Sequence, residues 1–161
     1  MKYLFSTLLL FIIMFNAAGQ SQLSSDSTKI IAMIGDWDKA WQIKDPVLAA
    51  KWYSCDARFT NAFGDKKKGQ EQIRVLLTEV FSLPFVMAGQ SETTKHDFQL
   101  LDKEQVLVHS DVVRKGQQLP DGSLLPDRQT THLRVFKKTA KGWQIVAHLI
   151  SDAKDKGSVR R

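Results

Sequence analysis

The stretch KGWQIVAHLISD, residues 141–152, has the pattern of a β-strand that starts after a turn. Successive side chains of a strand point to opposite faces. One face of this strand carries Trp143, Ile145, Ala147, Leu149 and Ser151. His148 belongs to the other face. Because the first face is the more apolar, we expect it to line the core and His148 to point outward.

The chain before this strand predicts helices first. Ile30, Ile34, Trp37 and Trp41 recur at spacings of four, three and four, which draws one apolar stripe along a helix over Ser27–Ile43. The Asp-Pro pair at 45–46 breaks this helix and suits the start of a second, short helix that ends near Tyr53.

The remaining segments predict one helix and five strands. Residues 57–63 alternate as a strand, and GQEQIRVLLTEVFS, residues 69–82, has the apolar side of a helix. Further strands are expected at 93–101, 104–115, 128–138 and 143–151. Three helices followed mainly by strands predict an α+β fold with an antiparallel meander.

The N-terminal segment predicts export. Residues 1–19 combine an early Lys2, an apolar run and small residues before position 20, which is the pattern of a cleaved secretory signal peptide. We expect a polar leader at 20–27, one domain at 28–152 and a charged tail at 153–161. Mass spectrometry of exported protein that began at Met1 would contradict cleavage near Gly19.

Composition excludes several classes of protein. The formal net charge is +6, but the basic residues lie in runs such as Lys66-Lys67-Lys68 without interleaved aromatic residues, so we expect no nucleic-acid partner. The apolar run near the N-terminus is too short for stable membrane insertion. The only cysteine, Cys55, excludes a disulfide within one chain.

Several segments in this order resemble a known superfamily. DWDKAW at 36–41, DPVLAAKWYSCDARFTNAFGDKKKGQEQIR at 45–74 and the strand at 143–151 are similar to SnoaL-like and SgcJ/EcaC-like (DUF4440-type) members of the nuclear transport factor 2-like superfamily. The resemblance implies a cone-shaped, curved antiparallel sheet whose concave face three helices cover. It also implies an apolar pocket and, often, a dimer. The superfamily contains isomerases, cyclases, dehydratases and binding modules, so it implies no single chemistry.

The residues expected to face inward form the predicted ligand site for a small apolar or aromatic molecule, with no cofactor and no metal. They are Trp41, Tyr53, Phe59, Asn61, Ser110, Thr131, Trp143, Leu149 and Ser151. Relatives often carry a polar residue, frequently His, where this chain has Leu149. The resemblance therefore implies that the usual acid/base residue is absent.

Other titratable residues leave alternatives open. His109, Asp111 and His132 on neighbouring strands could form a metal site or an acid/base pair, but we expect them on the outer face of the sheet. We also expect a homodimer through that face, which would include His132 and Arg134. Asp36 and Asp38 are the carboxylates that could reach the pocket from the first helix, and a solvent-facing position is expected for Asp38.

Three functions are consistent with these patterns. The first is an exported binding protein with an apolar pocket and no efficient turnover. The second is an isomerase, cyclase or dehydratase that removes a proton next to a carbonyl group. The third is a dimeric interaction module.

Overall fold

The computed structural model describes residues 25–119 and 121–153. The chain divides into two compact units, Met1–Ile34 and Gly35–Arg161. All described residues of the first unit, 25–34, are helical, and the second unit opens with helical residues 35–43. The helix predicted over Ser27–Ile43 is therefore confirmed. The predicted signal peptide at 1–19, most of the leader and the tail from residue 154 lie outside the described residues.

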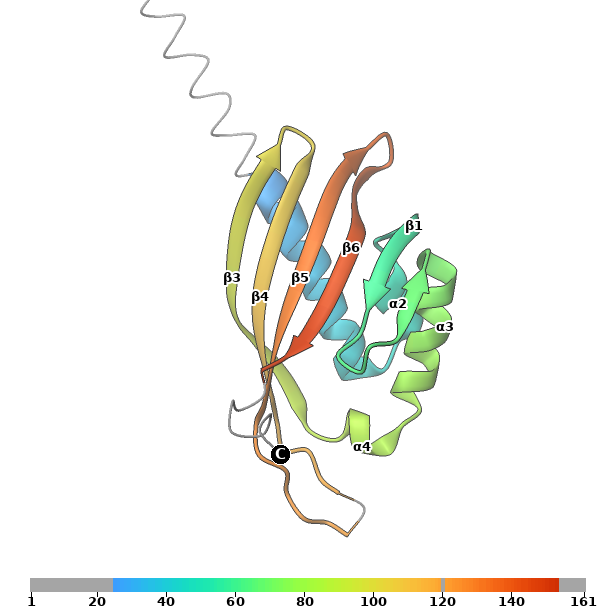
Figure 1. The fold of residues 1–161 in the computed structure, drawn as a ribbon, viewed down its shortest axis with the longest axis vertical. Helices are drawn as coiled ribbons and strands as arrows, with labels where there is room; N and C mark the ends of the chain where they lie inside the picture. The colour runs from blue at the N-terminus through green and yellow to red at the C-terminus, as the bar shows by residue number, and fades with distance from the viewer. Residues whose placement is uncertain (1–24, 120, 154–161) are drawn as a thin grey trace, which may run out of the picture. The chain divides into compact units, whose positions relative to one another are not determined.

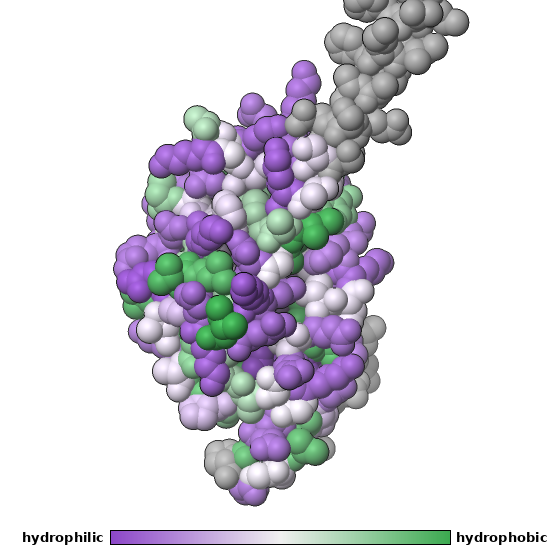
Figure 2. Space-filling model, turned by 180° about the vertical axis from the view of Figure 1, so that it is seen from behind, coloured by the Kyte–Doolittle hydropathy of each residue, from purple (hydrophilic) through white to green (hydrophobic). Residues whose placement is uncertain are grey.

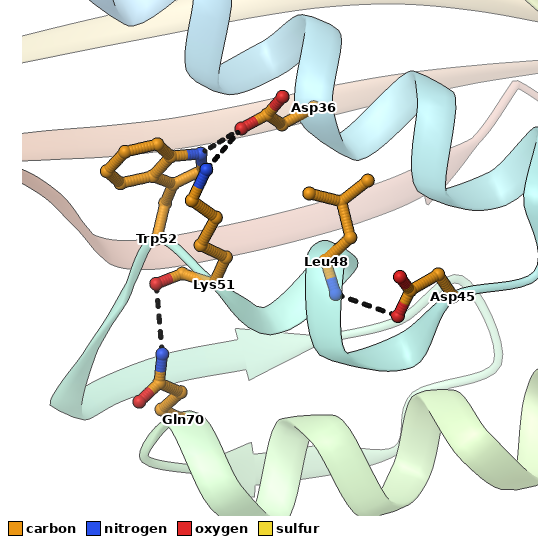
Figure 3. Close-up of polar contacts among 6 residues, drawn as sticks. All are labelled: Asp36, Asp45, Leu48, Lys51, Trp52 and Gln70. Carbon is orange, nitrogen blue, oxygen red and sulfur yellow. Dashed lines mark hydrogen bonds and ion pairs between the residues drawn. The ribbon is translucent and has the colours of Figure 1, made fainter.

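The second unit continues with the short helix α2, Pro46–Ala50. The Asp45 carboxylate caps it by accepting hydrogen bonds from the backbone N–H groups of Val47 at 2.9 Å and Leu48 at 3.0 Å. Figure 3 shows the second of these bonds. Such a cap satisfies N–H groups that have no partner within the helix. The prediction that this helix reaches Tyr53 is wrong, because Tyr53 pairs with Ile145 and begins a strand.

Six strands form one curved, open sheet (Figure 1). Their order is β2-β1-β6-β5-β4-β3. The strands are β1 (Tyr53–Thr60), β2 (Lys66–Lys68), β3 (Gln90–Asp102), β4 (Gln105–Lys115), β5 (Arg128–Thr139) and β6 (Gly142–Asp152). The last four pair antiparallel as the predicted meander, and β1 lies parallel to β6. The lysine run at 66–68 forms the edge strand β2, where lysines oppose pairing with another chain.

Two helices follow the β1–β2 hairpin: α3 (Gln70–Phe81), as predicted, and the unpredicted short α4 (Pro84–Met87). Gly69 starts α3 with a backbone φ of 80°. A Cβ atom at this position would collide with the carbonyl oxygen of Cys55. Glycine is therefore required for the chain to turn from β2 into α3 so close to β1.

Burial along the strands distinguishes the two faces of the sheet. We call the face that carries the buried Val108 of β4 the inner face and the opposite one the outer face. On β4 the alternation is as predicted, with Ser110 buried and His109 and Asp111 exposed. On β5 the predicted parity is wrong. Its buried residues are His132, Arg134 and Phe136. The apolar residues Leu133 and Val135 are half-buried on the outer face.

A register shift in β6 explains why the orientations predicted for His148 and Leu149 are wrong. Trp143 and Ile145 are buried as predicted. Between them and His148 the pairing with β5 shifts, because Val135 lies opposite Ala147 and Phe136 opposite Ile145. The extra residue is a β-bulge, which moves all later side chains to the opposite face. His148 is thus 2% exposed, whereas Leu149 is 45% exposed on the outer face.

Candidate functional site

A cavity lies between the inner face of the sheet and the helices of the second unit. Its volume is about 80 Å³, several times the ~10–15 Å³ that a single water needs. The space therefore suits a small organic ring. Most of its wall is apolar, with Trp37, Trp41, Phe59, Leu76, Leu77 and Ile150.

The helical residues at 35–43 place two tryptophans and one carboxylate in this wall. Trp37 and Trp41 are four residues apart, so they lie on the same side of the helix. Their ring centroids are 5.9 Å apart, and Trp41 meets Phe81 of α3 edge-on at 4.9 Å. Asp38 also lines the cavity. The expectation that Asp38 faces solvent is therefore wrong.

The surroundings of Asp38 make its carboxylate more basic than usual. One oxygen, Oδ2, accepts a hydrogen bond from the Thr93 hydroxyl at 2.8 Å. Burial raises the pKa of Asp38 above its ordinary value, an effect that outweighs the opposing influence of Thr93, Arg134 and His96. A carboxylate with a raised pKa is a better proton acceptor once it is ionised.

Asp36, two residues earlier, has a different role. Its Oδ2 accepts hydrogen bonds from Trp52 Nε1 at 2.8 Å and from Lys51 Nζ at 3.1 Å (Figure 3). Although burial acts to raise it, these two hydrogen bonds hold the pKa of Asp36 below its ordinary value. Asp36 does not line the cavity. It connects the first helix of this unit to the end of α2.

A chain of buried polar side chains begins behind the cavity wall. The Tyr53 hydroxyl lies 2.5 Å from His148 Nδ1, and His148 Nε2 lies 3.1 Å from His132 Nδ1. The same Nδ1 of His132 is 2.9 Å from Arg134 Nη2. We call these four residues the buried polar chain. Of the four, His132 lines the cavity.

The donors in the buried polar chain follow from Arg134, whose guanidinium can only donate. His132 Nδ1 therefore accepts, and His148 Nε2 must carry the hydrogen that points to it. His148 Nδ1 is then the acceptor for the Tyr53 hydroxyl. This arrangement leaves Nε2–H as the polar hydrogen of the His132 ring.

Burial and charge keep both imidazoles neutral. Burial, followed by the positive charge of Arg134, lowers the pKa of His132 and of His148 well below the ordinary value of 6.5. Arg134 itself is 1% exposed, lies over the Trp37 ring at 5.6 Å and donates to Ser110 Oγ at 3.3 Å. A neutral His132 can donate a hydrogen bond into the cavity without adding a positive charge there.

The register of the sheet explains why these groups meet. Arg134 lies opposite His148 on β6 and opposite Val108 on β4. His132 lies opposite Ser110. Residues directly opposite on neighbouring strands share a face and lie about 4.5–5.5 Å apart. Two adjacent rows across the sheet therefore bring the polar groups of three strands together.

The predicted ligand-site residues separate into three groups. Trp41, Phe59 and Asn61 line the cavity, and their contact with a ligand stays a prediction. Tyr53, Ser110 and Trp143 are buried as expected but lie outside its lining. The inward orientation predicted for Thr131, Leu149 and Ser151 is wrong, because the parity of β5 and the bulge of β6 turn them outward.

His132 was missed as a cavity residue because of how strand faces were assigned. Strand faces were assigned by apolarity, whereas the face that meets the cavity carries His132 and Arg134. The proposed group of His109, Asp111 and His132 does not form, since the first two are exposed on the outer face. The sequence of β5 did contain a signal. The large side chains of His132, Arg134 and Phe136 occupy alternate positions, as the side chains on one buried face of a strand do.

Three further features concern the described part of the chain. Among residues 25–119 and 121–153, no group of three or more His, Cys, Asp or Glu side chains could hold a metal ion. No helix within the same ranges is long and apolar enough to cross a membrane. In Figure 2, hydrophilic residues cover most of the visible face and apolar residues form small, separate patches.

The sequence matches no protein-family model and no curated protein. Solved structures with a similar backbone include a domain of unknown function with a cystatin-like fold from Nostoc punctiforme, with a TM-score of 0.72, 19% identity and coverage of 84% of this chain and 82% of that one. A proposed scytalone dehydratase from Novosphingobium aromaticivorans has a TM-score of 0.68 and 13% identity, with 84% and 89% coverage.

A third similar structure has the superfamily in its description. It is a nuclear transport factor 2-like protein with a cystatin-like fold, also from Novosphingobium aromaticivorans, with a TM-score of 0.67, 16% identity and coverage of 90% and 93%. These similarities confirm the fold that the sequence predicted. At such low sequence identities the similarities show the fold and do not show the function.

Proposed function

We propose that this chain, whose fold is that of the nuclear transport factor 2-like proteins, is an acid–base enzyme of the isomerase or dehydratase kind. Its substrate is a small, mostly apolar ring compound with a carbonyl group. The observation that carries the proposal is the meeting of Asp38 and His132 in one apolar cavity. A carboxylate with a raised pKa and a neutral imidazole donor that line the same cavity are suited to proton abstraction next to a carbonyl.

Each of the two groups has a distinct part. Asp38 takes a proton from the carbon next to the carbonyl, and the electron pair of that C–H bond moves toward the carbonyl oxygen. The Nε2–H of His132 donates to this oxygen as its negative charge develops. Return of the proton from Asp38 to another carbon gives isomerisation. If the neighbouring carbon carries a hydroxyl group, this group can take the proton from Asp38 and leave as water while the C=C bond forms and the carbonyl is restored, which gives dehydration.

The buried polar chain supports His132 in this part. Arg134 and His148 both donate toward Nδ1 of His132, which holds the imidazole ring with its Nε2–H outward from them. A donor fixed in place before the reaction stabilises developing charge without a cost of reorientation. We therefore assign Tyr53, His148 and Arg134 as positioning residues.

Exchange of ketone protons for deuterium tests the proposal. With cyclohexanone or 1-tetralone in D₂O, we expect the protein to accelerate loss of the proton signals next to the carbonyl above the rate in buffer, as followed by proton NMR. Because Asp38 must be ionised, the rate should fall as the pH drops through its raised pKa. No second change is expected near pH ~6.5, the ordinary imidazole value, since His132 is neutral there.

A binding protein without turnover is the second candidate. The mainly apolar wall favours it, because burial of ring surface alone provides affinity of about 25 cal/mol per Å². Ketones that change the tryptophan fluorescence of the protein but exchange no faster than in buffer would support binding alone. Trp37 and Trp41 in the cavity wall make that signal available.

We also propose a homodimer through the outer face of the sheet, with different residues from those expected. His132 and Arg134 are buried on the inner face and cannot contribute. Leu133 and Val135 lie half-buried on the outer face instead, next to the exposed Leu149. Light scattering should give twice the mass of the chain, and Leu149→Lys should shift it to the monomer mass. A monomer at every concentration would contradict the dimer.

A further inference from the structure

One end of the cavity carries two arginines. Arg114 of β4 lies directly opposite Arg128 of β5, and both line the cavity. Like charges that face each other across a sheet destabilise it. Arg128 is neutralised by Asp152, whose carboxylate accepts hydrogen bonds from Nε at 2.6 Å and from Nη2 at 3.0 Å. The pair of arginines and Asp152 together therefore carry one unbalanced positive charge.

That charge belongs to Arg114, which is 8% exposed. Its guanidinium donates to the Ser91 hydroxyl at 2.9 Å and to the Ala88 carbonyl at 3.1 Å, which are both neutral groups. Within the described part of the chain, no carboxylate lies within ion-pair distance of it. A buried charge without an opposite charge is costly unless a bound group supplies one.

Two buried donors at this end also have no acceptor among the described residues. They are Arg114 Nε and Trp41 Nε1. The two side chains are neighbours, since the guanidinium of Arg114 lies 5.4 Å from the centre of the Trp41 ring. Buried N–H groups are normally satisfied, and a carboxylate offers acceptors only.

We propose that the natural ligand carries a carboxylate, which binds Arg114 at the end of the cavity away from His132. This inference rests on the proposed function and names its substrate class: a ring compound with a carboxylate at one end and the reacting carbonyl at the other. Arg128 and His132 are four residues apart on β5, about 13 Å at ~3.3 Å per residue. This distance leaves room for one ring between the guanidinium groups of the arginines and the imidazole of His132. A single unbalanced charge fits a monoanion.

Binding of acids and their neutral amides tests the proposal. The probes are benzoate and 1-naphthoate, each compared with benzamide or 1-naphthamide, and the signal is tryptophan fluorescence. We expect the wild-type protein to bind each carboxylate at least about tenfold more tightly than its amide, since charge-assisted hydrogen bonds are the stronger ones. Equal affinity of acid and amide would overturn the carboxylate proposal and leave the proposed function standing.

Variants locate the effect. Arg114→Gln should weaken carboxylate binding about 10–100-fold and change amide binding less than twofold. Arg58→Gln, an exposed arginine on β1, is the matched control and should change neither. Arg114→Lys retains the charge and should keep a preference for the acid if the glutamine variant does not fold. Unchanged acid binding in Arg114→Gln would overturn the assignment, and failure of all four probes to bind would overturn the proposed function with it.

Discussion

Replacement of Asp38 by Asn is expected to lower the enzyme-catalysed exchange of ketone protons by about 10²–10⁴-fold, the usual contribution of a positioned general base. Asparagine keeps the size of the side chain and can still accept the hydrogen bond from Thr93. It cannot take up a proton from carbon. Ring binding, followed by tryptophan fluorescence, should therefore change little while exchange is lost.

Asp36→Asn provides the matched control, since it makes the same chemical change on the same helix. The Asp36 carboxylate contacts Lys51 and Trp52 and lies outside the cavity lining. We expect exchange to stay within about twofold of wild type, because no general base is removed. An equal loss in both variants would point to damage of the helix and would contradict the role of Asp38.

The second large effect is expected on stability. Replacement of His148 by Ala should lower the free energy of unfolding by about 3 kcal/mol, because it opens a cavity and leaves buried polar groups without partners. The Tyr53 hydroxyl loses its acceptor and His132 loses a donor. His148 also packs edge-on against Trp37 and Phe59, with ring centroids 5.1 and 5.2 Å away.

His109→Ala is the control for this prediction, because the same residue type is exposed on the outer face of β4. Urea unfolding should give a change of about 0.5 kcal/mol or less, as is usual for surface substitutions. If both histidine variants unfold at the same urea concentration as wild type, the inward position of His148 is wrong. The denaturant midpoint reports this difference when the slope is unchanged.

The elements of the fold could be predicted because their patterns are local. Helical spacing is clear at 27–43 and 69–82, and the four long strands alternate clearly. The end of α2 was missed because Tyr53 continues the apolar pattern, while its pairing with Ile145 is a long-range contact. Such contacts cannot be predicted from the periodicity of the sequence.

The candidate site could be predicted only in part, for physical reasons. Apolarity identifies the inner face of a strand only when that face is plain core, and on β5 it carries His132 and Arg134 instead. The bulge before His148 depends on the pairing of β6 with β5, so parity counted from Trp143 fails after it. The same shift turns the Leu149 side chain to the outer face and the His148 side chain to the inner face.

The most direct test of acid–base chemistry in the cavity is a crystal structure of the protein with phenol, a planar analogue of the enol of cyclohexanone. We expect the phenol ring to lie between Trp37, Trp41 and Phe59, which line the cavity. The phenol oxygen should lie ~2.6–3.2 Å from His132 Nε2, the distance of a hydrogen bond, with the Asp38 carboxylate beside the neighbouring ring carbon. Phenol bound with its oxygen away from His132, or bound only outside the cavity, would contradict acid–base chemistry by Asp38 and His132.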